Sequence, residues 1–285
     1  MAKVKIYSAG PWFTERQAAI LDKVEGMLSS KKNISPYFPR KDGVKLPSNQ
    51  KHDTELRFRV FRDNVTHIDE ADFVLADLDA GDSYSDTGTL WEVGYAMARD
   101  IPVIGYDFSG KAKERYGSIL NGLVDLLTDY EDLNTVLDTL SAEPTELEES
   151  TRARSKVLFV GAGNKEVDEK IATYISESGS SLRWVTNDHV NVYSRIDEIF
   201  DGVDYMIAVI DDRKPLVSWM IGQAYVRGIP VITYSDKDYG VNIMLLCALL
   251  THLRGTSELV AFLQKVKREG LESIPRFDIS TLNAI

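Results

Sequence analysis

An internal repeat constrains the fold of this chain more than any other feature of its sequence. Residues 91–104 and 219–232 share tryptophan, glycine, alanine and arginine at the same spacing, and both segments close with the run I-P-V-I. Two weaker matches lie upstream, pairing residues 3–10 with 156–163 and 71–76 with 203–208. Self-similarity of this kind marks repeated structural units. We therefore predict two copies of one fold in tandem.

A polar, proline-marked stretch separates the two copies. Residues 143–155 are rich in glutamate, serine and threonine, as interdomain linkers often are. This segment divides the chain into a first domain over residues 1–142 and a second over residues 156–285.

Within each copy, short apolar runs alternate with longer segments of helical period. That alternation is typical of an α/β fold whose parallel sheet is covered by helices, so we predict two doubly wound, flavodoxin- or Rossmann-like domains. The first copy has expected strands near 3–8, 35–38, 73–78 and 102–106, and expected helices near 14–29, 54–68, 87–99, 117–128 and 131–140. The second has expected strands near 156–160, 182–185, 205–210 and 230–234. Ligands of such sheets bind beyond the carboxyl ends of the strands, which are followed by residues 8–13, 79–92 and 106–116.

Charge and cysteine content narrow the class of partner. A formal net charge of −11 disfavours nucleic acid and anionic membranes as partners, because these require clustered cations, and favours a small ligand.

The single cysteine, Cys247, lies in an apolar run, so we interpret it as a buried core residue. A lone cysteine cannot form an internal disulfide, which favours a reducing compartment. The chain opens without an apolar leader and has no membrane-length apolar run, so we expect a cytoplasmic protein.

The first candidate binding segment spans residues 6–16, where a strand ends in a small-residue turn followed by Trp12 and Phe13. Exposed aromatic rings can stack on a flat heterocycle. Alternatively, the two rings cap the core. The glycines of a dinucleotide fingerprint are missing here, and residues 161–163 are too short to provide one.

The second candidate segment spans residues 77–96 and contains a carboxylate in an apolar setting. Asp86 or Thr87 can cap a helix whose second turn carries Glu92. An exposed glutamate is the ordinary alternative, but the repeat places Met220 at the equivalent position, which indicates a buried face. A desolvated carboxylate beside a cleft is a candidate functional group.

These two segments resemble the nucleoside 2-deoxyribosyltransferases and their nucleotide N-glycosidase relatives. The opening I-Y-x-A-G-x-W-F-T at residues 6–14 is similar to the start of the family's sequences, and D-x-G-T-x-x-E-x-G-Y-A at residues 86–96 is similar to its catalytic strand-loop-helix. The resemblance covers most of residues 1–142 and returns, diluted, over residues 156–285. It implies transfer of a 2-deoxyribosyl group between nucleobases, without a cofactor or metal.

Site residues follow from the resemblance. Glu92 matches the nucleophile that holds the deoxyribosyl group as an ester, Tyr7 the phenol that orients it, and Asp86 the acid that contacts the sugar hydroxyls. The family's base-protonating aspartate falls on Asn64, beside Asp63, and an amide cannot deliver a proton as an acid does. The expected substrate-binding set is Gly10, Trp12, Phe13, Gln50, Asp63, Asn64, Gly88, Asn242 and Met244.

The second copy has lost this catalytic set, since Val160, Lys214 and Met220 replace the tyrosine, the aspartate and the glutamate. The second copy retains an N-x-M element at Asn242 and Met244. This element resembles the N-x-M element that, in the family, reaches into the active site of a neighbouring subunit. We therefore predict an intrachain pseudo-dimer with one working site, in which Asn242 contacts the 5′ side of the sugar and Met244 covers the base. The alternative is that both are ordinary residues of a helix. A further homo-oligomer also stays open.

Other chemistries find no support in the sequence. The four histidines do not have the spacing of metal ligands. The sequence also contains no P-loop and no G-x-S-x-G elbow. The predicted substrates are 2′-deoxynucleosides and free nucleobases, and the opening loop of the first copy shows no cluster of phosphate donors. Two alternatives to transfer remain, a nucleoside or nucleotide N-glycoside hydrolase using Glu92 and a non-catalytic nucleotide sensor.

Overall fold

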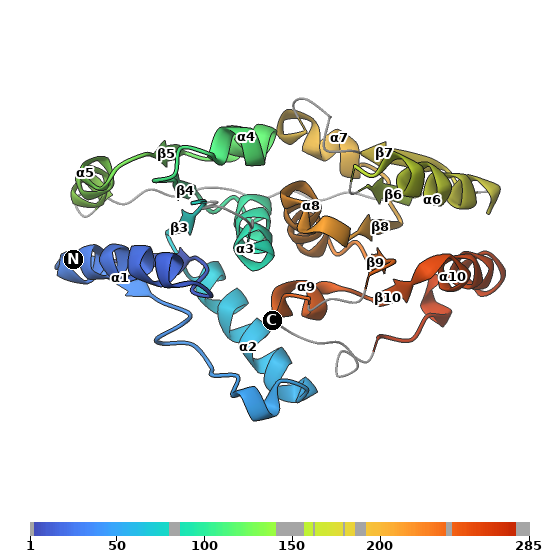
Figure 1. The fold of residues 1–285 in the computed structure, drawn as a ribbon, viewed down its shortest axis with the longest axis horizontal. Helices are drawn as coiled ribbons and strands as arrows, with labels where there is room; N and C mark the ends of the chain where they lie inside the picture. The colour runs from blue at the N-terminus through green and yellow to red at the C-terminus, as the bar shows by residue number, and fades with distance from the viewer. Residues whose placement is uncertain are drawn as a thin grey trace.

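The computed structural model describes residues 3–79, 86–140, 157–161, 163–178, 180–185, 192–237 and 241–277. They form two α/β domains, each a parallel five-stranded sheet flanked by helices (Figure 1). The predicted linker, residues 143–155, lies outside the described residues. None of the helices within these ranges is both long and apolar enough to cross a bilayer.

The first sheet has the strand order β2-β1-β3-β4-β5. Its strands are β1 (Val4–Ala9), β2 (Ile34–Tyr37), β3 (Phe73–Asp77), β4 (Val103–Tyr106) and β5 (Asp125–Leu127). Its helices are α1 (Glu15–Ser30), α2 (Thr54–Asp69), α3 (Thr87–Ala98), α4 (Ala112–Tyr116) and α5 (Tyr130–Leu140). Apolar residues of α1 and α5 cover one face, whereas α2 and α3 cover the other. The inner strands are buried on both faces, which explains why they appear in the sequence as continuous apolar runs.

The second sheet has the same topology, with the order β10-β9-β8-β6-β7. Its strands are β6 (Val157–Val160), β7 (Leu182–Val185), β8 (Tyr205–Val209), β9 (Val231–Ser235) and β10 (Thr251–Arg254). Its helices are α6 (Lys165–Glu177), α7 (Ile196–Phe200), α8 (Pro215–Val226), α9 (Ile243–Ala248) and α10 (Gly255–Glu269). Short 3-10 helices occur in both domains. They are η1 (Ser48–Gln50) and η2 (Gly117–Gly122) in the first, and η3 (Tyr193–Arg195), η4 (Asp211–Arg213) and η5 (Leu271–Ser273) in the second.

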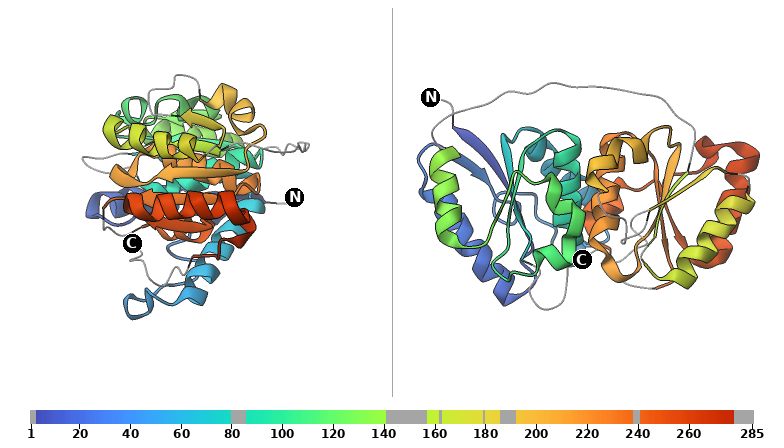
Figure 2. Two further views of the ribbon diagram at one scale, coloured as in Figure 1. Left: turned by 90° about the vertical axis from the view of Figure 1, so that its right-hand side faces the viewer. Right: turned by 90° about the horizontal axis from the view of Figure 1, so that it is seen from above.

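The two domains meet through α3 and α8, which lie side by side at the centre of the molecule (Figures 1 and 2). A β-carbon at Gly94 would overlap the carbonyl of Trp219, and one at Gly222 would overlap the carbonyl of Trp91. The helix backbones therefore touch at two glycines that occupy equivalent positions in the repeat. The Gln223 amide also donates to the Gly94 carbonyl at 2.8 Å, and a single apolar cluster runs through both domains.

The predicted helix over residues 117–128 is wrong. Gly117 takes a φ of +48°, the backbone then forms the 3-10 turn η2, and residues 125–127 pair with β4 as the edge strand β5. The leucine spacing of this stretch resembles that of a helix, but its apolar side chains are divided between the apolar clusters on the two faces of the sheet. Strand β10 was also not expected, so each predicted four-stranded sheet gains a fifth strand at its edge.

Candidate active site

Glu92 lies on the second turn of α3, in the interior of the molecule. Asp86 caps this helix, with its carboxylate accepting the backbone N–H of Gly88 and that of Thr89, the latter at 2.8 Å. The cap fixes where the helix begins and therefore which face carries Glu92. Only 6% of the Glu92 surface is exposed, so the burial expected from its repeat partner Met220 is confirmed.

Two polar side chains meet the carboxylate of Glu92. The hydroxyl of Tyr7, on β1, donates to Oε1 of Glu92 at 2.6 Å, and the Asn64 amide, on α2, lies 3.4 Å from the same oxygen. Alternation along β1 points Tyr7 toward the face that α2 and α3 cover. Three elements distant in sequence thus bring together the tyrosine, the asparagine and the glutamate named from the sequence.

Burial dominates the proton equilibria of this group. Desolvation raises the pKa of Glu92 to about 8, with a smaller contribution from the charge of Asp86, whereas the hydrogen bonds from Tyr7 and Asn64 lower it. The pKa of Tyr7 is well above its usual range because the phenol is buried beside Glu92. Tyr7 therefore stays protonated across the physiological pH range, and its hydroxyl remains a donor to the carboxylate whenever Glu92 is ionised.

A second layer of aromatic residues, which the sequence did not predict, supports Tyr7. The ring of Tyr37 stacks on Tyr7 with centroids 5.7 Å apart, and the ring of His67 stacks on Tyr37 with centroids 3.6 Å apart. The Tyr37 hydroxyl donates to Asp63 at 2.6 Å, and the backbone N–H of Val44 donates to the same carboxylate. Asp63 is thus engaged with Tyr37, and the side chain that faces Glu92 is Asn64.

The second domain reaches this site through α9. Asn242 caps α9 by accepting the backbone N–H of Met244 at 2.8 Å, and its side chain packs so closely on Gly88 that a β-carbon there would overlap it. The Met244 sulfur lies 3.6 Å from the Asn64 amide. Both residues are part of a helix, as the alternative interpretation held, and both also touch the cluster around Glu92.

The remaining candidates are more scattered. Trp12 and Phe13 stack on each other and are 43% and 57% exposed, so they do not cap the core. Gly10 is buried where a β-carbon would press on Leu21 and Asp77, which explains the need for glycine at the end of β1. Gln50 is exposed on η1, and no contact within the described residues joins it to Glu92.

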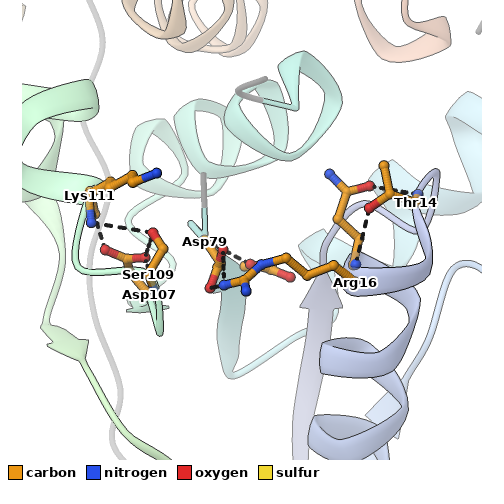
Figure 3. A network of polar contacts seen from close by, with 9 residues as sticks. Thr14, Arg16, Asp79, Asp107, Ser109 and Lys111 are labelled. Atoms are coloured by element: carbon orange, nitrogen blue, oxygen red, sulfur yellow. Dashed lines mark hydrogen bonds and ion pairs between the residues drawn. The ribbon is translucent and has the colours of Figure 1, made fainter. Parts of the chain in front are cut away.

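A separate polar network organises the loops at the carboxyl ends of β3 and β4 (Figure 3). Arg16 reaches from α1 and contacts both carboxylate oxygens of Asp79, at 2.9 and 3.1 Å. Asp107 accepts the hydroxyl of Ser109 at 2.6 Å and the backbone N–H of Ala112 at 2.8 Å. These contacts hold the first turns of α1 and α4 against the edge of the sheet near which Glu92 lies.

Comparison with known proteins finds a match to the first domain. The sequence model of the family described as "Nucleoside 2-deoxyribosyltransferase" matches residues 6–125, which contain Tyr7, Asn64, Asp86 and Glu92. Residues 6–125 are therefore similar to the nucleoside 2-deoxyribosyltransferases. The glutamate, the tyrosine and the capping aspartate of the candidate site all lie within the matched residues.

Solved structures give similar matches over half of the chain. A 2-deoxyribosyltransferase from the psychrotolerant bacterium Bacillus psychrosaccharolyticus is 29% identical, with 50% of this chain and 100% of that one covered and a TM-score of 0.41. A conserved protein from Enterococcus faecalis V583 is 19% identical, with 48% and 99% covered and a TM-score of 0.39. No curated protein matches the chain.

Proposed function

We propose that this chain transfers a 2-deoxyribosyl group between nucleobases through a covalent ester on Glu92. The observation that carries this proposal is the buried Glu92 carboxylate, held at 2.6 Å by the Tyr7 hydroxyl within a domain similar to the deoxyribosyltransferases. Cleaving an N-glycosidic bond develops positive charge on the sugar, and an adjacent carboxylate both stabilises that charge and traps the cation. The matched family is a family of transferases, and the specific activity of this chain is our inference.

The proposed reaction consists of two displacements at C1′. In the first, an oxygen of ionised Glu92 bonds to C1′ while the C1′–N bond breaks, and its electron pair leaves with the base nitrogen, which then acquires a proton. In the second, the nitrogen of an incoming base bonds to C1′, gives up its proton, and releases the Glu92 carboxylate. Two inversions give net retention of configuration at C1′.

Each neighbour of Glu92 has a distinct part in this scheme. Tyr7 binds Oε1 and leaves the other carboxylate oxygen as the attacking atom. Asp86 is half-buried at the start of α3, where its remaining hydrogen-bonding capacity suits a sugar hydroxyl. Asn64 orients Glu92 but carries no acidic proton. The departing base must therefore take its proton from solvent, or be acidic enough to leave as an anion.

The second domain completes the pocket in this proposal. Asn242 and Met244 come from α9 and contact Gly88 and Asn64, the two positions that flank the reacting carboxylate. Covering the site excludes water from the ester until a second base arrives, which is the requirement for transfer rather than hydrolysis.

Incubation with deoxyuridine and adenine tests the proposal. Deoxyadenosine among the products supports transfer, whereas free deoxyribose indicates an N-glycoside hydrolase using the same carboxylate. Binding without turnover indicates a nucleotide sensor and refutes the enzymatic proposal. Glu92→Gln is the matched inactive variant, and intact mass after rapid quenching should show one deoxyribosyl unit on the parent protein and none on the variant.

A further inference from the structure

Asp63 lies next to Asn64 on α2, and its carboxylate joins three parts of the first domain. One oxygen, Oδ2, accepts the hydroxyl of Tyr37 at 2.6 Å and the backbone N–H of Val44 at 3.1 Å. Tyr37 is the last residue of β2, and Val44 lies in the loop that follows this strand. A single carboxylate oxygen therefore ties α2 both to the carboxyl end of β2 and to its loop.

The ring of Tyr37 extends this anchor to Tyr7. The two tyrosines are paired in register on β2 and β1, and their rings stack with an interplanar angle of 22°. His67 follows Asp63 by one turn of α2, its Nδ1 lies 2.8 Å from the Asp63 carbonyl oxygen, and its ring stacks on Tyr37 at an angle of 11°. Helix α2 thus holds Tyr37 at its hydroxyl through Asp63 and at its ring through His67, so the ring cannot turn without loss of these contacts.

Tyr7 passes the constraint on to Glu92. Its side chain is fully buried, and its hydroxyl donates to Glu92 at 2.6 Å. Burial raises the pKa of Tyr7 most, and the charges of Glu92 and Asp63 raise it further, so the phenol keeps the proton that it donates. Hydrogen bonds weaken steeply with distance and angle, which makes this contact sensitive to a shift of the stacked Tyr37 ring. Helix α2 therefore acts on Glu92 directly through Asn64 and indirectly through this chain of contacts.

We propose that Asp63 is a positioning residue, which fixes the hydrogen bond from Tyr7 to Glu92 by anchoring the ring of Tyr37. The catalytic consequence rests on the function proposed above, whereas the effect on the ionisation of Glu92 does not. The sequence placed Asp63 among the substrate-binding residues; in this proposal it acts on the substrate only through Tyr7 and Glu92.

A titration of Glu92 by carboxyl ¹³C NMR on glutamate-labelled protein tests the proposal, with Glu92→Gln assigning the resonance. Tyr37→Phe and Asp63→Ala each remove the anchoring hydrogen bond, and both should raise the pKa of Glu92 from about 8 by about 0.5–1 pH unit. Asp63→Asn keeps an oxygen that can accept both donors and should titrate as the parent does. Asp86, the charged neighbour of Glu92, is unchanged in every variant. A rise in Asp63→Asn as large as that in Tyr37→Phe would assign the effect to charge and overturn the proposal.

Tyr95→Phe is the matched control for a merely structural role. The hydroxyl of Tyr95 also donates to an aspartate of α2, Asp69, at 2.8 Å, but its ring stacks on Trp91 instead of Tyr7. This variant should lower the melting temperature about as much as Tyr37→Phe and leave the pKa of Glu92 at its parental value. If Tyr37→Phe also leaves that pKa unchanged, the contact with Asp63 only stabilises the fold and the proposal is wrong.

Kinetics with deoxyuridine and adenine separate this proposal from the proposed function. At pH 7, a rise of 0.5–1 pH unit in the pKa of Glu92 reduces its ionised fraction about 3- to 10-fold. In Tyr37→Phe, kcat should fall by this factor, approach the parental value above about pH 9, and be accompanied by an unchanged KM. A raised pKa without turnover of any donor would refute the enzymatic function and leave the positioning role intact. Parental turnover with an unshifted pKa would do the reverse.

Discussion

The hydroxyl of Tyr7 lies 2.6 Å from Oε1 of Glu92, a contact between residues 85 positions apart. This hydrogen bond lowers a pKa that burial has raised to about 8, so its loss should raise the pKa of Glu92 further. In Tyr7→Phe we expect the acid limb of the pH profile of kcat/KM to move to higher pH, because the nucleophile must be ionised. The rate at neutral pH should fall about 10- to 100-fold. A profile that keeps its parental midpoint would show that Tyr7 does not act on the ionisation of Glu92.

The buried carboxyl of Glu92 should also make stability depend on pH. Between its usual value of 4.5 and about 8, the folded protein keeps a proton that the unfolded chain has lost. The unfolded state then binds fewer protons, and the free energy of unfolding falls as pH rises through this window. Glu92→Gln removes that dependence, so its melting temperature should rise relative to the parent between about pH 5 and pH 8. The exposed substitution Glu177→Gln is the control, and a constant difference for Glu92→Gln would contradict the assigned burial effect.

Asn242 combines a structural and a proposed binding role, which two substitutions can separate. Asn242→Ser keeps a side-chain oxygen for the Met244 N–H but loses the amide that packs on Gly88, whereas Asn242→Ala loses both. Loss of the cap costs about 1 kcal/mol, so only the alanine variant should melt measurably earlier. Both variants should raise the KM for the donor about tenfold if the amide contacts substrate. A normal KM in the serine variant would restrict Asn242 to capping α9.

The close approach of α3 and α8 makes the two domains depend on each other for stability. Gly94→Ala and Gly222→Ala each place a methyl group against a backbone carbonyl of the facing helix, which should cost about 1–3 kcal/mol. Urea denaturation should report this loss as a lower midpoint. Gly26→Ala is the matched control on α1, because a β-carbon there meets nothing within 4 Å, and it should stabilise the chain by about 0.5–1 kcal/mol.

Much of this architecture could be predicted because the deciding residues are local or repeated. The matched glycines at 94 and 222 indicated equivalent helices in the two halves, and those helices pack on each other at these positions. The burial of Glu92 followed from its apolar repeat partner Met220. Tyr7 and Asn64 could be predicted from the family resemblance, and in the fold both side chains contact the carboxylate of Glu92.

The features that escaped prediction depend on tertiary contacts. Strand β5 has three residues, too few for a pattern, and only its pairing with β4 distinguishes it from a helical turn. The support of Tyr7 by Tyr37 and His67 joins a strand to a distant helix through ring stacking, which leaves no periodic signal. Arg213 and Lys214 lie in the second domain and line the same small hollow as Thr87 only because α3 and α8 pack together.

Asn64 provides the most direct test of how the departing base is protonated. Its amide lies 3.4 Å from Glu92, and aspartate has nearly the same shape, so Asn64→Asp adds an acidic group without a change in packing. The introduced carboxyl and Glu92 would then share a proton, since two adjacent buried carboxylates cannot both ionise.

A shared proton predicts a specific dependence on the leaving base. General acid catalysis contributes about 10²- to 10⁴-fold and matters most for bases that leave poorly without a proton. In Asn64→Asp, kcat should therefore rise more for donors with basic leaving groups than for donors whose base departs readily as an anion. Single-turnover rates on a series of donors that differ only in the acidity of the leaving base measure this slope. If the variant slows every donor by the same factor, the position serves to orient Glu92 and the proton comes from solvent.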